Sequence, residues 1–303
     1  MKVTTARVGA ALIAGTIAIG VAIVPAAAAT AISPAVTYSF KTLDNPNDPA
    51  FNQLLGINNH NKIAGYGVQG HSNKGYLLSS PLGQPSYRAE NFPGSAETQV
   101  AGINDNGVTV GQFFKAGRLS GFYRQNGIYH KVTFPGSSSS NELLGINNSG
   151  IAVGDYMDSL GNWHAYRLNV NTHKFSRINI RNSPNVTATG INAGGTVVGY
   201  FTNAAAQVVS FLHRANGQLV ILAKSGADGG TQAFGINKGG LVVGAFTIGG
   251  STFGFTWSQG RFHTVNDPNG IGSTIITGVN NAGDLVGSYT DRHGNTNGLL
   301  AIP

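Results

Sequence analysis

A ten-residue motif occurs six times along this chain of 303 residues. Each copy begins with Gly, followed by Ile or Val and then by Asn. It continues through a turn-like stretch and ends in Gly. The copies are GINNHNKIAG from Gly56, GINDNGVTVG from Gly102, GINNSGIAVG from Gly145, GINAGGTVVG from Gly190, GINKGGLVVG from Gly235 and GVNNAGDLVG from Gly278. Successive copies start 43 to 46 residues apart. A fixed period of this length indicates a repeat protein, in which each unit buries its apolar face against its neighbours.

Each copy has the pattern of a tight β-hairpin. Asn occupies the first turn position, where its side chain can accept a hydrogen bond from a backbone N–H two residues later. Three residues on stands a glycine, suited to the positive φ that follows a type I turn, or Asn61 in the first copy. The turn asparagines are Asn58, Asn104, Asn147, Asn192, Asn237 and Asn280. Because every repeat needs the same turn, we interpret these residues as scaffold and not as an active site.

Four short strands are expected in each unit. A third strand centres on Tyr76, Phe122, Tyr166, Phe211, Phe255 and Leu299, and a fourth ends near Pro or Gly. Four strands in about 44 residues match one propeller blade. The last unit lacks a fourth strand, while residues 38–43 precede the first unit as an unpaired one. We therefore predict an all-β, six-bladed β-propeller of four-stranded antiparallel blades, closed by pairing of residues 38–43 with the last blade. A β-solenoid is the alternative.

These units resemble the bacterial extracellular repeat family named for a His-Ala-Phe tripeptide in its third strand, the HAF repeat. The corresponding positions read His164-Ala165-Tyr166 in one unit and end in Tyr, Phe or Leu in the others. The resemblance covers all six units and implies secretion and a propeller-like fold. It implies no reaction and no catalytic residues.

Residues 1–30 have the features of a signal peptide. A short basic start is followed by an uncharged, mostly apolar run over residues 8–24 and by small residues, so that cleavage after Ala29 or Ala31 fits. An uncleaved membrane anchor is the alternative, since this run approaches the length of a membrane span. We expect a secreted monomer without a membrane span after cleavage, in which residues 31–303 form one propeller domain.

Composition excludes several classes of function. The chain has no cysteine, which excludes disulfides and thiol chemistry. Its net charge is +7, but Lys2 and Arg7 lie in the predicted signal peptide, and no two Lys or Arg residues are adjacent. Nucleic-acid-binding proteins usually gather basic residues on one face, so we do not expect a nucleic acid as partner.

The hairpin pattern separates the two faces of the predicted ring. The Asn turns and the short connections between third and fourth strands share one face, here called the turn face. The longer connections between second and third strands and between blades share the opposite, variable face, where binding residues are expected. The candidate ligand-binding residues are His71, Arg118, Asp158, Trp163, His164, Asp291, Arg292 and His293. Trp163 could stack on a sugar ring, or it could simply cover the edge of its blade.

Candidates for catalysis and metal binding are few. Glu97 and Glu142 come at similar points in successive inter-blade loops and could form the acid and base of a glycosidase, although repeats often share a polar residue for solvation. Asp44, Asn47 and Asp48 are rich in oxygen ligands and are candidates for Ca²⁺. They lack the Gly and distal Glu of an EF-hand loop, and a strand-ending turn is the alternative. We expect no other cofactor.

Together these features favour a secreted, non-catalytic binding module whose partner is an extracellular glycan or protein. The alternative is a secreted glycan-active hydrolase or lyase that uses loop carboxylates of the variable face. A passive extracellular spacer is a third option.

Overall fold

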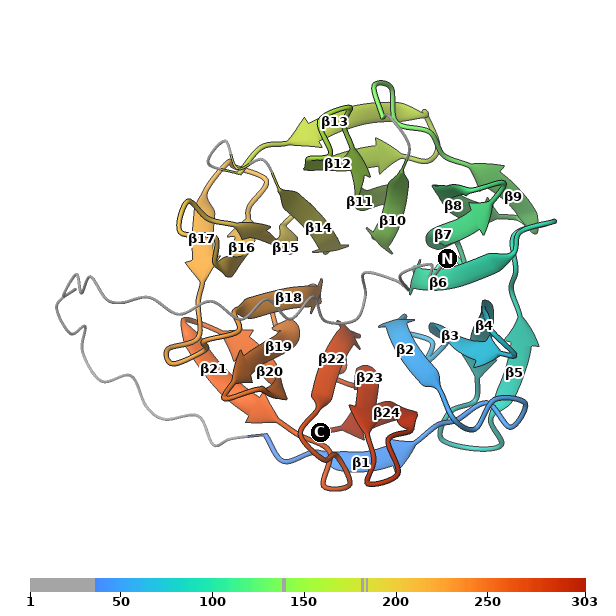
Figure 1. Ribbon diagram of the computed structural model, residues 1–303, viewed down its shortest axis with the longest axis vertical. Helices are drawn as coiled ribbons and strands as arrows, with labels where there is room; N and C mark the ends of the chain where they lie inside the picture. The colour runs from blue at the N-terminus through green and yellow to red at the C-terminus, as the bar shows by residue number, and fades with distance from the viewer. Residues whose placement is uncertain (1–35, 138–139, 181–182, 184) are drawn as a thin grey trace, which may run out of the picture.

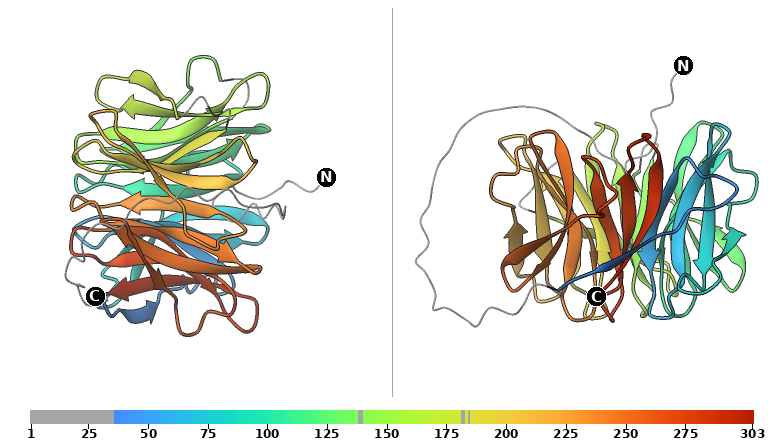
Figure 2. Two further views of the ribbon diagram at one scale, coloured as in Figure 1. Left: turned by 90° about the vertical axis from the view of Figure 1, so that its left-hand side faces the viewer. Right: turned by 90° about the horizontal axis from the view of Figure 1, so that it is seen from below.

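The computed structural model describes residues 36–137, 140–180, 183 and 185–303. Their strands form six four-stranded antiparallel sheets, which surround a central axis as blades (Figure 1). The protein is therefore a six-bladed β-propeller, as the repeat period predicts. Seen from the side, it is a disc with two faces (Figure 2). The predicted signal peptide, residues 1–30, lies outside the described residues.

Five blades consist of four consecutive strands each, the first nearest the axis. Blade 1 contains β2 (Asn52–Ile57), β3 (Ile63–Gln69), β4 (Ser72–Ser79) and β5 (Ser86–Ala89), and blade 2 contains β6 (Glu97–Ile103), β7 (Thr109–Lys115), β8 (Arg118–Gln125) and β9 (Ile128–Lys131). Blade 3 contains β10 (Asn141–Ile146), β11 (Ile151–Met157), β12 (Trp163–Asn169) and β13 (Lys174–Ile178). Blade 4 contains β14 (Val186–Ile191), β15 (Val197–Thr202), β16 (Val208–His213) and β17 (Leu219–Leu222), and blade 5 contains β18 (Thr231–Ile236), β19 (Val242–Ile248), β20 (Ser251–Ser258) and β21 (Arg261–Val265).

Blade 6 joins the two ends of the described chain. It contains β22 (Thr274–Val279), β23 (Leu285–Thr290) and β24 (Thr296–Ile302), with β1 (Ser39–Thr42) as its outermost strand. The antiparallel register pairs Ser39 with Ile302 and Thr42 with Leu299. The predicted closure of the ring by the N-terminal strand is thus confirmed, and it leaves no gap between the first and last blades.

The turn that begins each repeat has the predicted conformation. In the first blade, the side-chain oxygen of Asn58 accepts hydrogen bonds from the backbone N–H groups of His60 and Lys62. The residue three positions later has positive φ in every blade, including Asn61 at 55° and Gly107 at 75°. Each turn joins the innermost strand to the second strand, so all six meet around the axis.

A β-bulge interrupts every innermost strand just before the Gly-Ile-Asn sequence, which is Gly-Val-Asn in blade 6. In β6 the register shifts between Val100 and Gly102, so that Ala101 has no partner on β7. Gly111 lies opposite Val100, and a side chain at this position would overlap the carbonyl oxygen of Gln99. The second glycine of each repeat is therefore required by the bulge, which leaves no room for a Cβ atom.

The first glycine of each repeat lets neighbouring blades approach at the axis. A Cβ atom at Gly145 would lie 2.6 Å from the carbonyl oxygen of Thr189, in the next blade. A Cβ atom at Gly278 would lie 2.9 Å from the carbonyl oxygen of Leu55, which belongs to blade 1. Next to these glycines, the bulge residues Leu55, Ala101 and Leu144 belong to one apolar cluster, although they come from three different blades.

Apolar cores fill the spaces between blades. In blades 2 to 6 the aromatic residue two positions after the second glycine is buried in a core, and two of these rings stack on an aromatic residue of the preceding inter-blade loop: Phe113 on Phe92 and Tyr156 on Phe134. The ring centroids are 3.7 Å and 4.0 Å apart. These contacts hold blades 2 and 3 against the loops that precede them.

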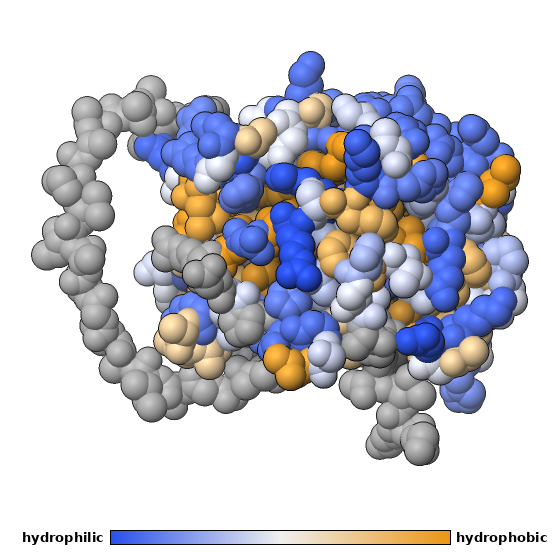
Figure 3. Space-filling model, turned by 90° about the horizontal axis from the view of Figure 1, so that it is seen from above, coloured by the Kyte–Doolittle hydropathy of each residue, from blue (hydrophilic) through white to orange (hydrophobic). Residues whose placement is uncertain are grey.

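The side of the disc seen in Figure 3 is mostly polar, with apolar residues in the recesses between polar ones. The outermost strands follow this pattern: Arg88 of β5 and Lys131 of β9 are exposed. The outermost strand of blade 4, β17, differs because its sequence LVIL has no charged residue. The described part of the chain contains no helix long and apolar enough to cross a membrane.

Candidate functional site

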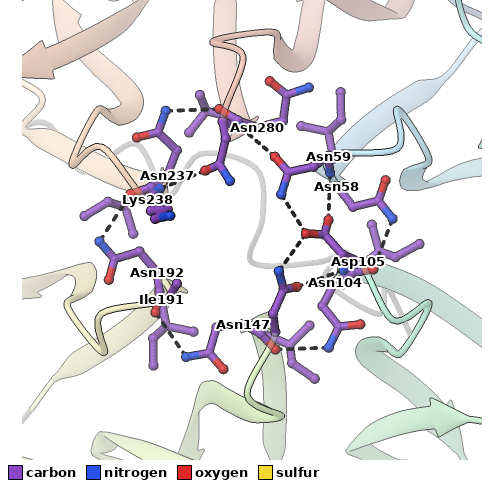
Figure 4. Close-up of a pocket in the computed structure, with 18 residues that line it drawn as sticks. Asn58, Asn59, Asn104, Asp105, Asn147, Ile191, Asn192, Asn237, Lys238 and Asn280 are labelled. Carbon is purple, nitrogen blue, oxygen red and sulfur yellow. Dashed lines mark hydrogen bonds between the residues drawn. The ribbon is translucent and has the colours of Figure 1, made fainter.

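A cavity of about 90 Å³ opens on the axis at the turn face. Six equivalent segments line it, each consisting of the Ile or Val, the Asn and the following residue of one repeat (Figure 4). Ile191 points away from the axis and belongs to a core cluster between blades. The wall of the cavity is therefore made of backbone and amide groups, with room for several water molecules.

The turn asparagines form a ring of hydrogen bonds around this cavity. In five blades the side-chain Nδ2 donates to the backbone carbonyl of the equivalent Asn in the next blade, as Asn104 does to Asn147 at 3.0 Å. At the junction of blades 6 and 1, Asn280 instead donates to the side chains of Asn61 and Asp284. The side-chain oxygen of each Asn thus accepts hydrogen bonds within its own turn, and the side-chain nitrogen donates a hydrogen bond to the neighbouring blade.

This second role of the asparagines was not predicted from the sequence. The turn alone needs an acceptor, which Asp or Ser would also supply at this position. Only Asn adds a donor to that acceptor. The presence of Asn, and never Asp or Ser, in all six copies was the available signal.

The next residue of each repeat forms the rim of the cavity. The rim residues are Asn59, Asp105, Asn148, Ala193, Lys238 and Asn281. Asp105 accepts hydrogen bonds from the backbone N–H and side-chain amide of Asn59 and from the amide of Asn148, at 2.6 to 2.8 Å. Burial acts to raise the pKa of Asp105, but these hydrogen bonds outweigh it and the pKa is lowered. The carboxylate is therefore held in its charged form.

On the variable face, the best-defined group of predicted residues lies in blade 3. Asp158 and His164 flank the loop between β11 and β12, and their Oδ2 and Nε2 atoms are 2.7 Å apart. The other oxygen of Asp158 accepts the N–H groups of Leu160 and Asn162, which fixes the loop. Trp163 precedes His164 in β12 and is half-buried, while Leu160 is 84% exposed at the tip.

The hydrogen bond from His164 lowers the pKa of Asp158 to about 2, from its ordinary 3.8. Because the folded-state pKa is below the unfolded value, the pair favours the folded loop above about pH 4 and this contribution is lost as the pH falls towards 2. We expect the Asp158 carboxyl to titrate near pH 2 by NMR, and His164→Ala to move the midpoint up towards 3.8. An unchanged midpoint in the variant would contradict the pairing.

The other predicted ligand residues are not brought together. His71 and Arg118 are exposed in hairpins of blades 1 and 2. In blade 6, Asp291 accepts the N–H groups of His293 and Asn295 within its own hairpin, and Arg292 contacts His293 at 3.1 Å. His71, Arg118 and the group in blade 6 thus lie on three separate blades around the variable face.

The placement of Glu97 and Glu142 in equivalent inter-blade loops was wrong. Both lie in innermost strands, because β6 and β10 extend further towards the variable face than the sequence suggested. Glu97 pairs with Phe114 and accepts a hydrogen bond from Asn73, whereas Glu142 pairs with Asp155 and is 3% exposed. The two carboxylates thus occupy different positions of their blades.

The segment proposed for Ca²⁺ forms a turn. Asn45 accepts the N–H of Asn47 through its side chain and the N–H of Asp48 through its carbonyl, and Asp44 accepts the N–H of Gly298. Burial raises the pKa of both Asp44 and Asp48, which disfavours their charged forms. Across the residues placed in the structure, no three His, Asp or Glu side chains gather as a metal site. The alternative of a strand-ending turn therefore fits this segment.

No family model matches the chain, and no curated protein matches it in sequence. Solved structures are similar in fold. A putative TolB from Agrobacterium tumefaciens superposes with a TM-score of 0.60 at 13% identity, over 84% of this chain and 91% of the other. A gluconolactonase from Xanthomonas campestris gives 0.56 at 12%, over 88% and 90%. A mutant of the Aleuria aurantia lectin AAL, in complex with Fucα1-6GlcNAc, gives 0.51 at 11%, over 85% and 98%. At these identities the likeness concerns the propeller fold alone.

Proposed function

We propose that this protein is a secreted, non-catalytic binding module of the HAF-repeat type, and that it holds an extracellular glycan at the loop between β11 and β12. One observation carries the proposal: Trp163 begins β12 directly before His164, in a hairpin whose loop backbone is fixed by Asp158. An aromatic ring offers an apolar surface to a sugar ring, and polar groups of the same hairpin offer partners to hydroxyl groups of the glycan.

Two further points support this choice. The lectin of similar fold was solved with a bound fucosylated sugar, so a propeller can present a glycan site. The hydrolase alternative loses its specific support, because Glu142 is 3% exposed and does not occupy the position of Glu97. A structure that places two carboxylates on opposite sides of an open cleft would have favoured it.

The test is co-sedimentation of the purified protein with a panel of insoluble polysaccharides and cell-wall preparations. We expect one polymer to retain the protein, Trp163→Ala to weaken retention roughly tenfold or more, and Trp163→Phe to keep most of it. Ile248→Ala is the control, because this residue is 38% exposed in the hairpin tip of blade 5 on the same face.

Three results would overturn the proposal. Retention that is equal in the Trp163→Ala and Ile248→Ala variants would exclude the blade 3 loop as the site. Soluble sugar released from the bound polymer would make the protein an enzyme. Absence of retention across the whole panel would instead point to a protein partner or a spacer.

A further inference from the structure

The rim of the axial cavity, on the face opposite the proposed glycan site, follows a rule that holds in four of six blades. The backbone N–H of a rim residue donates to a side-chain oxygen of the rim residue in the next blade (Figure 4). The donor and acceptor pairs are Asn59 to Asp105, Asp105 to Asn148, Lys238 to Asn281 and Asn281 to Asn59, at 2.8 to 3.0 Å.

The two exceptions are adjacent. Asn148 is followed around the ring by Ala193, and Ala193 is followed by Lys238; neither following side chain carries an acceptor oxygen. Among the residues placed in the structure, the backbone N–H groups of Asn148 and Ala193 accordingly have no hydrogen-bond acceptor. Both residues are exposed at the mouth of the cavity, so these N–H groups are open to a ligand.

The charge of this gap favours an anion. Lys238 is exposed on the rim at the end of the gap and carries the positive charge of its ammonium group. The acid of the rim, Asp105, lies three blades from Lys238 but next to Asn148, and its carboxylate already accepts hydrogen bonds from Asn59 and from the side-chain amide of Asn148. Backbone N–H groups without an acceptor, in a concavity beside a cation, favour binding of an anion.

Asp105 also shows which anion fits. Its carboxylate spans a backbone N–H and an amide N–H of Asn59, so the repeat geometry accepts a carboxylate at this position of the rim. We propose that the gap at blades 3 to 5 binds the carboxylate of a small ligand, which supplies the oxygens that Ala193 and Lys238 lack. The bound group would accept the N–H groups of Asn148 and Ala193 and pair with Lys238.

This site can be tested by NMR titration of the backbone amides of the full chain with sodium glucuronate and sodium acetate, and with glucose as the neutral comparison. We expect the amides of Asn148 and Ala193 to shift with both carboxylates and to be unaffected by glucose. Equal affinities would show that only the carboxylate is bound, and tighter binding of glucuronate would show that the sugar ring contributes as well; both results support the site.

Variants make the test specific. Ala193→Asn should provide the missing oxygen for the Asn148 N–H, as Asn148 does for Asp105, and should abolish the shift at Asn148. Lys238→Met should weaken carboxylate binding roughly tenfold, while Lys62→Met, an exposed lysine next to the blade 1 turn, should leave it unchanged. Binding that survives in Ala193→Asn, equal shifts with glucose, or no shift with either carboxylate would overturn the proposal. None of these results depends on Trp163 or the variable face.

Discussion

Replacing Gly111 with valine is expected to lower the free energy of unfolding by about 3 kcal/mol or more, which corresponds to a melting temperature lower by roughly 10 °C. The reason is the bulge in β6. A Cβ atom at Gly111 would overlap the carbonyl oxygen of Gln99 and lie 2.9 Å from a ring carbon of Phe122. The oxygen belongs to a strand held by its neighbours, so it cannot move away without breaking the ladder of the blade.

The matched control is Gly83→Val. Gly83 lies in the turn between β4 and β5, where a Cβ atom would find no heavy atom closer than 4.0 Å. Thermal unfolding of both variants, followed by circular dichroism, separates crowding from the general effect of adding a valine. A melting temperature of Gly111→Val equal to that of Gly83→Val would show that the bulge can relax and would contradict this account.

The sequence predicted the fold because its information on the blade is local. The spacing of the repeats, the Asn and Gly positions of the turn and the strand left over at residues 38–43 each depend on residues close together in the chain. Even the substitution of Asn61 for glycine has its predicted positive φ. Local geometry was sufficient to predict the blade, and the number of repeats was sufficient to predict a ring of six blades.

The bulge and the asparagine ring were not predicted, because they concern atoms that come together only when the blades assemble. Asn104 contacts Asn147 across 43 residues, and a turn motif contains no information on this contact. Ala101 has no partner on β7 because the bulge adds a residue to β6.

The candidate sites could be predicted only in part. Asp158, Trp163 and His164 were chosen for their residue types, but the sequence did not indicate that Asp158 and His164 pair. The gap in the rim could have been found by aligning the six repeats, since the fourth and fifth copies have Ala193 and Lys238 where other copies have Asn or Asp. The sequence did not indicate that the backbone N–H of this position donates to the next blade around the axis, or that its side-chain oxygen accepts from the preceding blade.

Removal of the closing strand is expected to have the largest effect of all. A chain that begins at Asp44 lacks β1 and also Leu43, which is 2% exposed in the core between blades 1 and 6. Truncation of one such residue typically costs about 3 kcal/mol, and here the edge of β24 is exposed as well. We expect this protein to lose its cooperative thermal transition and to aggregate, as measured by circular dichroism and light scattering. A chain that begins at residue 36, and so keeps β1, is the control.

Circular permutation separates the loss of the strand from the loss of the ring. Because Ser39 pairs with Ile302, the segment Tyr38–Leu43 can follow Pro303 through a short Asn-Gly turn like Asn126-Gly127 between β8 and β9. Blade 6 would then have four consecutive strands, as the other blades do. We expect the permuted chain that begins at Asp44 to recover a monomeric, cooperatively unfolding protein. If it aggregates as the truncated chain does, or if the truncated chain melts normally, the strand does not close the ring in the way described.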